Sequence, residues 1–211
     1  MIVIQPLVCG AYEENAYLVY EEARPDCLVI DPGDDLPVLE KAIGQTGKKL
    51  TDILLTHGHF DHTLAAAPLK EAHGARVHIH PLDTHMLFSP DAAVMNAAMC
   101  RLPFTPVSAD EPFPMEPTFE LTACGLDFEG LHTPGHTPGS VCLKLPAAQA
   151  VFTGDTIFAN GYGRYDFPGG DLHQLMKSLR AVLSLPRSLT VYAGHGEADT
   201  MAAIAARWNI D

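Results

Sequence analysis

The sequence predicts an α/β fold in which two β-sheets are covered by helices. Strand and helix patterns alternate along the 211 residues, with stretches typical of antiparallel meanders. A proline-punctuated, irregular stretch at residues 103–117 divides the chain into two halves of similar character. Several strand patterns end directly before a turn that carries a histidine or an aspartate. We expect these turns to gather where the two halves meet, because ligands bind where strands end.

The first half is predicted to begin with strands and then to alternate helix and strand. Apolar, β-rich segments predict strands at residues 2–8, 16–20, 27–30, 53–55 and 77–80. A helix is predicted at residues 36–46, because Leu36, Leu39 and Ile43 share one face and Gly47 follows. A second helix should run from directly after residues 57–62 to His73, with Pro68 tolerable only near its first turn. A third helix is expected to start at Ser89-Pro90-Asp91.

The second half is predicted to repeat this plan. Strands are expected at residues 119–122, 126–132, 141–145, 151–153 and 189–192, a helix at 171–184, and a short helix at the end. The length suits a single domain that spans residues 1–211.

Composition excludes several classes of protein. The formal net charge of −13 disfavours nucleic-acid binding, which depends on Lys and Arg. No apolar run is long enough to span a membrane, and the first residues read as a strand and not as a signal peptide. Five cysteines without C-x-x-C spacing are typical of free thiols, so we expect a cytoplasmic protein.

The segment His57-Gly58-His59-Phe60-Asp61-His62 predicts a metal site directly after the strand at residues 53–55. Imidazole and carboxylate are preferred ligands of zinc and similar divalent ions. Gly58 permits the sharp turn that brings these side chains together.

Three later turns carry further candidate ligands. His136 lies in Thr133-Pro134-Gly135-His136-Thr137-Pro138-Gly139-Ser140, Asp155 in Thr153-Gly154-Asp155-Thr156, and His195 in Gly194-His195-Gly196. Each turn follows an apolar strand pattern, and tight turns can hold a side chain within about 2 Å of an ion.

With these motifs the chain resembles the metallo-β-lactamase superfamily, and within it the glyoxalase II (hydroxyacylglutathione hydrolase) type of thioester hydrolase. The resemblance extends from Asn15 to His195 and implies an αββα sandwich with two mixed sheets. It also implies two divalent ions, of which zinc is expected and iron or manganese are alternatives. By position, His57, His59 and His136 would hold one ion, Asp61, His62 and His195 the other, and Asp155 would bridge them together with a hydroxide.

Two departures from glyoxalase II concern the substrate. Sixteen residues follow His195, so we expect the short, single-domain branch without a C-terminal glutathione-binding domain. In the loop at residues 161–167, Arg164 and Asp166 stand at positions where the family has glutathione-contacting Lys and Tyr. Arg164, Tyr165 and Asp166 are therefore candidate substrate contacts, with an ion pair between Arg164 and an aspartate as the alternative.

The same loop also resembles the persulfide dioxygenases, which use a single iron. The corresponding ligands would be His57, His136 and Asp155. Hydrolysis of a small-molecule thioester is the leading prediction, with the dioxygenase, or hydrolysis of another ester or lactone, as alternatives. A binding module without turnover is disfavoured, because structural zinc sites usually have only four ligands.

Other candidates have more ordinary explanations. Asp61 is expected to be a ligand, a general base, or both, and Asp31 and Thr56 either orient a histidine or act as turn residues. Met95 and Met99 either cover the substrate or pack against the sandwich. The remaining histidines are predicted to be structural or solvated on helix and strand surfaces: His73, His78, His80, His85, His132 and His173.

Overall fold

The computed structural model describes residues 1–89 and 98–208 and contains two mixed β-sheets packed face to face. The first sheet has the order β1-β2-β3-β4-β5. Its strands β1 to β3 are antiparallel neighbours, whereas β3, β4 and β5 run parallel. The strands are β1 (Ile2–Cys9), β2 (Glu14–Glu21), β3 (Asp26–Ile30), β4 (Lys49–Leu54) and β5 (Arg76–His78).

The second sheet is formed by the second half of the chain, as the sequence predicts. Its order is β11-β10-β9-β8-β7-β6, and only β9 and β10 pair in parallel. The strands are β6 (Thr118–Ala123), β7 (Leu126–His132), β8 (Val141–Leu145), β9 (Ala150–Gly154), β10 (Thr190–Ala193) and β11 (Asp199–Thr200).

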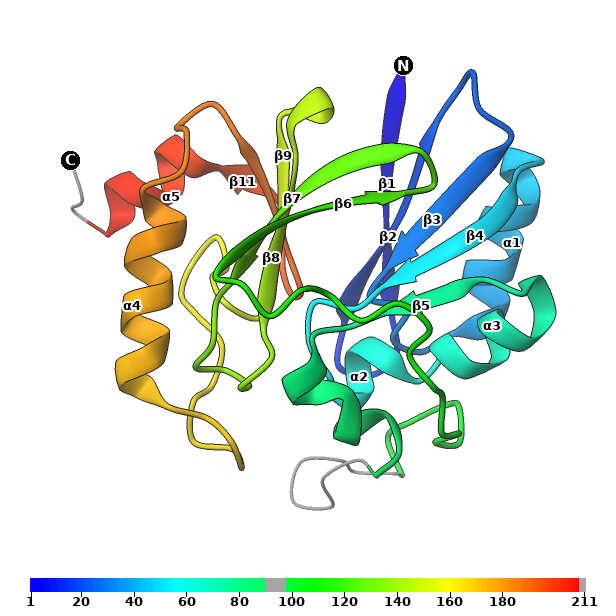
Figure 1. The fold of residues 1–211 in the computed structure, drawn as a ribbon, viewed down its shortest axis with the longest axis horizontal. Helices are drawn as coiled ribbons and strands as arrows, with labels where there is room; N and C mark the ends of the chain where they lie inside the picture. The colour runs from blue at the N-terminus through cyan, green and yellow to red at the C-terminus, as the bar shows by residue number, and fades with distance from the viewer. Residues whose placement is uncertain (90–97, 209–211) are drawn as a thin grey trace.

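Helices cover the outer face of each sheet, which gives the predicted αββα sandwich (Figure 1). On one side lie α1 (Leu36–Thr46) and α3 (Ala66–His73), and on the other lie α4 (Leu172–Leu183) and α5 (Met201–Arg207). Asp171 caps α4 by accepting a hydrogen bond from the backbone N–H of Gln174, and Thr200 caps α5 in the same way.

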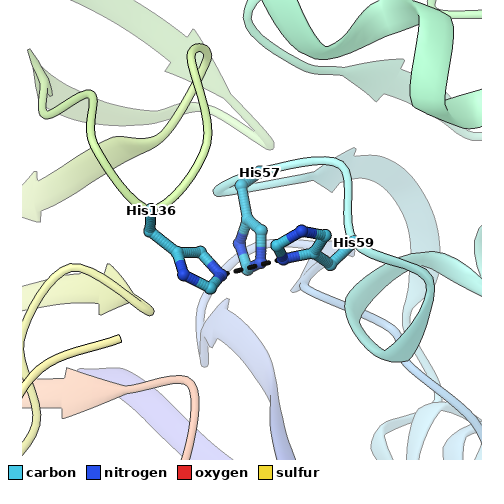
Figure 2. A group of neighbouring side chains, drawn as sticks. All are labelled: His57, His59 and His136. Atoms are coloured by element: carbon cyan, nitrogen blue, oxygen red, sulfur yellow. Dashed lines mark hydrogen bonds between the residues drawn. The ribbon is translucent and has the colours of Figure 1, made fainter. Parts of the chain in front are cut away.

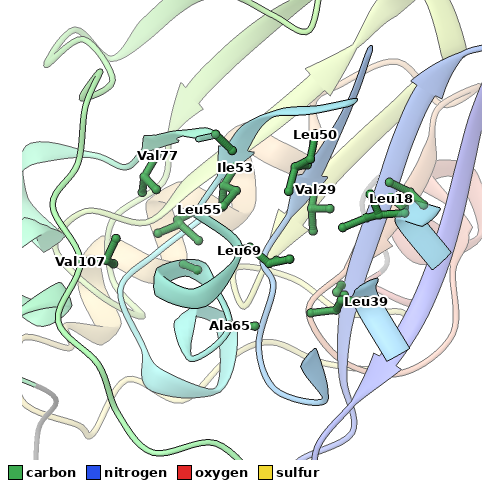
Figure 3. Close-up of a cluster of buried hydrophobic side chains, with 14 of the residues drawn as sticks. Leu18, Val29, Leu39, Leu50, Ile53, Leu55, Ala65, Leu69, Val77 and Val107 are labelled. Atoms are coloured by element: carbon green, nitrogen blue, oxygen red, sulfur yellow. The ribbon is translucent and has the colours of Figure 1, made fainter. Parts of the chain in front are cut away.

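The two-residue period of the strands distributes the apolar side chains over separate cores. On β2, Leu18 faces the layer below α1 and α3, whereas Tyr17 and Val19 face the second sheet. Figure 3 shows the outer core of the first sheet, in which Leu39 and Leu69 from the helices meet the strand side chains. A third core joins α4 and α5 to the second sheet.

Near residues 57–62, two features of the structure differ from the sequence prediction. The expected second helix is interrupted: α2 (Phe60–Thr63) is a single turn, and α3 begins at Ala66, which leaves Pro68 in its first turn where it is tolerated. After β5 the chain forms a 3₁₀ helix, η1 (Pro81–Leu87), which the sequence analysis did not predict. A second short 3₁₀ helix, η2 (Pro146–Ala148), joins β8 to β9.

The predicted surface positions of two histidines are wrong. His78 and His80 are buried and not on the surface, because His78 contacts the Asp52 carboxylate at 2.9 Å and the His80 ring stacks on His132 at 4.2 Å. Their predicted structural role fits these contacts. The helix that was expected to start at Ser89-Pro90-Asp91 and the predicted role of Met95 in covering the substrate fall on residues 90–97, which lie outside the described residues. In the part of the chain that is described, no helix is both long and apolar enough to cross a membrane.

Candidate metal centre

The structure brings all seven predicted ligand residues to one edge of the sandwich. His57 and His59 follow the end of β4, and the short helix α2 presents Asp61 and His62. The other three residues come from the β7–β8 turn, the end of β9 and the end of β10, and they are His136, Asp155 and His195. These segments are far apart in sequence and meet because strand ends from both sheets lie at the same edge.

The ligand atoms form two groups that match the two predicted sets. One group is His57, His59 and His136, and the other is Asp61, His62 and His195; within each group the candidate ligand atoms lie within 4.8 Å of one another. Figure 2 shows the rings of the first group directed toward one another, with His59 Nδ1 2.8 Å from His136 Nε2. A third combination of buried side chains, Asp31 with His57 and His62, also meets this distance.

The Asp155 carboxylate lies between the two groups. Its Oδ2 is 3.5 Å from His136 Nε2 and 3.6 Å from His195 Nε2, and its Oδ1 is 3.4 Å from His62 Nε2. One side chain therefore faces ligand atoms of both groups at once. This is the placement that a carboxylate shared by two ions requires.

The donor set fits divalent cations because several buried atoms lack any other partner. His57 Nε2, His62 Nε2 and Asp155 Oδ1 are buried and make no hydrogen bond with any of the described residues. Buried polar atoms are normally paired. Four carboxylates also crowd this region (Glu14, Asp31, Asp61 and Asp155), and buried negative charge requires compensation by cations.

Four of the five histidines have a hydrogen-bond partner on the ring nitrogen that faces away from the centre. Thr56 Oγ1 lies 3.1 Å from His57 Nδ1 and donates to Asp31 Oδ2 at 2.6 Å. The same carboxylate oxygen lies 3.1 Å from His62 Nδ1. Asp31 thus orients one ring directly and another through Thr56, which supports the orienting alternative over the turn alternative.

The remaining two rings are oriented by backbone carbonyls. The Arg164 carbonyl oxygen is 2.6 Å from His136 Nδ1, and the Tyr12 carbonyl oxygen is 3.1 Å from His195 Nδ1. An imidazole that donates Nδ1–H to a carbonyl must present an unprotonated Nε2, which is the form that ligates metals.

The electrostatics of the site favour neutral His57 and His59 and ionised aspartates, whereas Asp155 and Asp61 raise the pKa of His62 and His195 against the effect of burial. Burial, together with the neighbouring His62 and His136, holds the pKa of His57 well below its ordinary value. Burial and the adjacent His136 lower the pKa of His59 to about 3. Burial alone would raise the pKa of Asp61, but His62 and the hydrogen bond with His195 lower it. For His57, His59 and Asp61, these are the protonation states that metal binding needs.

Two glycines allow the loops to approach the carboxylates. A Cβ atom on Gly194 would lie 2.3 Å from Asp155 Oδ1, and one on Gly33 would lie 1.9 Å from the Asp61 carbonyl oxygen. Both distances are far below a van der Waals contact. Any larger residue at either position would displace a ligand.

Asp83 is a buried residue beside the candidate centre that the sequence did not mark. It lies on η1 and is fully buried. Its carboxylate accepts hydrogen bonds from the Gly58 N–H at 3.0 Å, the Thr137 hydroxyl at 2.6 Å and the Gly139 N–H at 2.7 Å. Gly58 separates His57 from His59, and Thr137 follows His136. Asp83 therefore fastens together the two loops that carry the first ligand group, and no motif spacing marked it.

Glu14 was also missed. It is fully buried at the start of β2, 3.7 Å from His62 Nδ1, and neither of its carboxylate oxygens has a hydrogen-bond partner among the described residues. Burial raises the pKa of Glu14 well above its ordinary value. A charged residue at the start of an apolar strand is the only signal that could have marked it.

A pocket of about 310 Å³ opens in front of the ligand groups. Its lining includes the ligands His59, Asp61, His136, Asp155 and His195, the aromatic residues Tyr12, Phe60, Phe158, Tyr162 and Phe167, and Gly163 and Arg164. Arg164 donates to both carboxylate oxygens of Asp166, at 2.9 and 2.8 Å, so the ion-pair alternative describes this structure. Tyr165 and Asp166 are exposed and do not line the pocket.

The fold and the paired ligand groups define a metal-dependent hydrolase of the metallo-β-lactamase class. The family model of the metallo-beta-lactamase superfamily matches residues 9–195. The chain belongs to this superfamily.

Relatives and solved structures of the superfamily have different activities in their names. Hydroxyacylglutathione hydrolase GloC of Haemophilus influenzae is 35% identical, over 94% of this chain and 92% of that protein. Among solved structures, TTHA1623 in a di-iron-bound form is 39% identical with a TM-score of 0.83, covering 95% of this chain and 96% of that chain. The BLEG-1 B3 metallo-beta-lactamase is 32% identical with a TM-score of 0.83, covering 95% of each chain. ETHE1 from Myxococcus xanthus is 26% identical with a TM-score of 0.75, covering 99% of this chain and 88% of that chain.

Proposed function

We propose that this protein hydrolyses small-molecule thioesters with two divalent cations. His57, His59 and His136 would hold one cation, Asp61, His62 and His195 the second, and Asp155 would bind both. The observation that carries the proposal is the position of Asp155, whose two oxygens face both ligand groups. Zinc is the proposed metal; iron and manganese accept the same nitrogen and oxygen donors, and a similar structure is described as di-iron-bound.

Two bound cations would supply a water that ionises near neutral pH and a polarised substrate carbonyl. The chain contributes the positioning of both. Asp61 lines the pocket, 3.6 Å from His195 Nε2, and its ionised carboxylate would orient the attacking water by accepting a hydrogen bond from it. Asp31 and the Arg164 carbonyl keep the ligand rings in place during this step.

A thioester suits this site because its leaving group needs little help. The water oxygen bonds to the acyl carbon, the C–S bond breaks, and the products are a carboxylate and a thiol. A thiolate is a good leaving group, since thiol pKa values are about 8.5, whereas an amine leaving group requires a general acid. The hydroxyacylglutathione hydrolase GloC, named for cleavage of such a bond, supports this choice.

Recognition of glutathione itself is proposed to be weak. Arg164 is the only Lys or Arg in the described lining of the pocket, and its guanidinium is paired with Asp166. S-lactoylglutathione should therefore be cleaved with a high KM, because contacts remote from the reacting bond supply the binding energy for recognition.

The second candidate is an iron-dependent persulfide dioxygenase. His57, His136 and Asp155 would be its ligands, and the loop Gly163-Arg164-Tyr165-Asp166-Phe167, which resembles that of these enzymes, favours it. The geometry that argues against it is the second ligand group, because a single-iron enzyme has no use for Asp61, His62 and His195 held within 4.8 Å of one another.

One experiment separates the two candidates. Protein loaded separately with zinc, iron and manganese is assayed on a panel of thioesters that includes S-lactoylglutathione, and oxygen uptake is measured with glutathione persulfide. We expect thioester cleavage and no oxygen uptake. Oxygen consumption without thioester cleavage would overturn the hydrolase proposal.

A further inference from the structure

The pocket in front of the metal ligands has walls of aromatic side chains, and we infer that the substrate presents an uncharged, flat apolar group next to the scissile bond. An aromatic acyl thioester, such as a phenylacetyl thioester, has this chemistry. The inference rests on the proposed function, because it specifies the acyl group that the same site accepts.

The aromatic walls are held in place by contacts among themselves and with the ligands. Tyr12 and Phe60 pack edge to face at 5.1 Å, and Phe60 is buried. Phe158 packs edge to face on the ring of His195 at 6.0 Å. Such edge-to-face pairs stabilise their arrangement beyond simple burial. The rings are therefore already positioned before a substrate enters.

The loop at residues 161–167 forms another part of the pocket lining. Phe167 packs edge to face on His59 at 5.8 Å, and the Arg164 guanidinium lies over the Phe167 ring at 4.1 Å from its centroid. A flat group that enters the pocket would contact the aromatic side chains of its lining while its carbonyl faces the candidate ligands. The pocket volume of about 310 Å³ is at the small end of the range for ligand pockets and suits a single ring.

The charges of the pocket disfavour an acyl group with a carboxylate. The one guanidinium on the described wall of the pocket is neutralised by Asp166, whereas Asp61 and Asp155 would be neutralised by the proposed cations. The formal net charge of the chain is −13, which repels anions at longer range. A carboxylate at the far end of the acyl group, away from the proposed cations, would lose its water without gaining a cationic partner from the described wall.

The test uses three thioesters of the same thiol, N-acetylcysteamine, so that the leaving group stays constant. Their acyl groups are phenylacetyl, acetyl and succinyl. We expect kcat/KM to be highest for phenylacetyl, about tenfold or more above acetyl, which corresponds to about 1.4 kcal/mol of ring burial, and lowest for succinyl. A succinyl thioester cleaved as efficiently as the phenylacetyl thioester, or a series without preference, would overturn the inference.

Two variants identify the wall and the charge responsible. Phe167→Leu should reduce the phenylacetyl preference, whereas Phe88→Leu, at an exposed phenylalanine outside the pocket lining, should not. Asp166→Asn should raise kcat/KM for succinyl relative to acetyl, because Arg164 loses its partner; Asp127→Asn, on the exposed part of β7, is the matched control. An unchanged succinyl-to-acetyl ratio in Asp166→Asn would contradict the charge argument.

A binding measurement separates this inference from the proposed function. Ketone analogues, in which a methylene replaces the sulfur, are titrated calorimetrically into the metal-loaded protein. If no thioester is cleaved but the phenyl analogue binds more tightly than the carboxylate analogue, the proposed function fails and the pocket inference stands. If thioesters are cleaved and the phenyl analogue has no advantage, the pocket inference fails and the proposed function stands.

Discussion

Replacement of Asp83 should loosen the centre without removing any ligand. In Asp83→Ala the buried N–H groups of Gly58 and Gly139 lose their acceptor, which costs about 1–3 kcal/mol each and so about 2–6 kcal/mol of unfolding free energy in total. The Thr137 hydroxyl still has Ser140 Oγ as a hydrogen-bond partner at 2.7 Å, so the loss of its bond to Asp83 adds less to this cost. Asp83→Asn retains one acceptor oxygen, so we expect about half this loss.

The same variant should weaken metal binding at the first ligand group. Loss of a partner that orients ligands typically lowers metal affinity by about 10–100-fold. Because Asp83 joins the loops of His57, His59 and His136, the ion held by these three residues should be lost first in a competition with a chelator. Metal content is measured after each step, and the free energy of unfolding is measured in urea with the metal removed.

Asp52→Asn provides a matched control for this prediction. Asp52 is also fully buried and accepts hydrogen bonds from Thr51 Oγ1 and the Cys124 N–H, both at 2.9 Å, but touches neither ligand loop. The Asp52→Asn variant should have a lower free energy of unfolding and an unchanged affinity for both metal ions. Folded Asp83→Asn protein with unchanged metal affinity, or an equal loss in both variants, would refute the role assigned to Asp83.

Three further predictions concern the bridge, its surroundings and the buried histidine pair. Asp155→Ala should lose both ions and His195→Ala chiefly one by elemental analysis; full metal and activity in Asp155→Ala would exclude the shared carboxylate. Gly194→Ala should abolish metal binding while the protein stays folded by circular dichroism, because the new Cβ would lie 2.3 Å from Asp155 Oδ1; normal metal content would contradict this geometry. Burial and the stacked His132 lower the pKa of His80 to about 4, below the unfolded value of about 6.5. The unfolded chain thus binds more protons, so the free energy of unfolding should fall as pH drops from about 6.5 toward 4. Urea titrations should show a smaller fall in His80→Gln, and an identical pH dependence would reject this role.

The sequence predicted the sandwich because its signals are local. Alternating apolar residues marked the strands, and Gly47 follows the last residue of α1 as expected. The convergence of the candidate ligands was also predictable, since most of them lie in a short turn after an apolar strand and little chain separates them from that strand. His57, Asp155 and His195 are clear examples.

The features that were missed depend on contacts between distant segments. Asp83 acts on loops that lie 25 and 54 residues away along the chain. Glu14 meets His62 only after β2 and α2 have packed together. The ion pair of Arg164 with Asp166 was one of two open alternatives, because sequence alone does not say whether an exposed guanidinium turns toward a neighbour or toward a substrate.

Anomalous diffraction from crystals of the metal-loaded protein tests the central claim most directly. The account predicts two metal peaks, one within about 2.0–2.2 Å of a nitrogen of each of His57, His59 and His136, the other bound by Asp61, His62 and His195. The Asp155 carboxylate should contact both. A single peak bound by His57, His136 and Asp155, with the second ligand group empty at saturating metal, would contradict the two-cation hydrolase and favour the single-iron alternative.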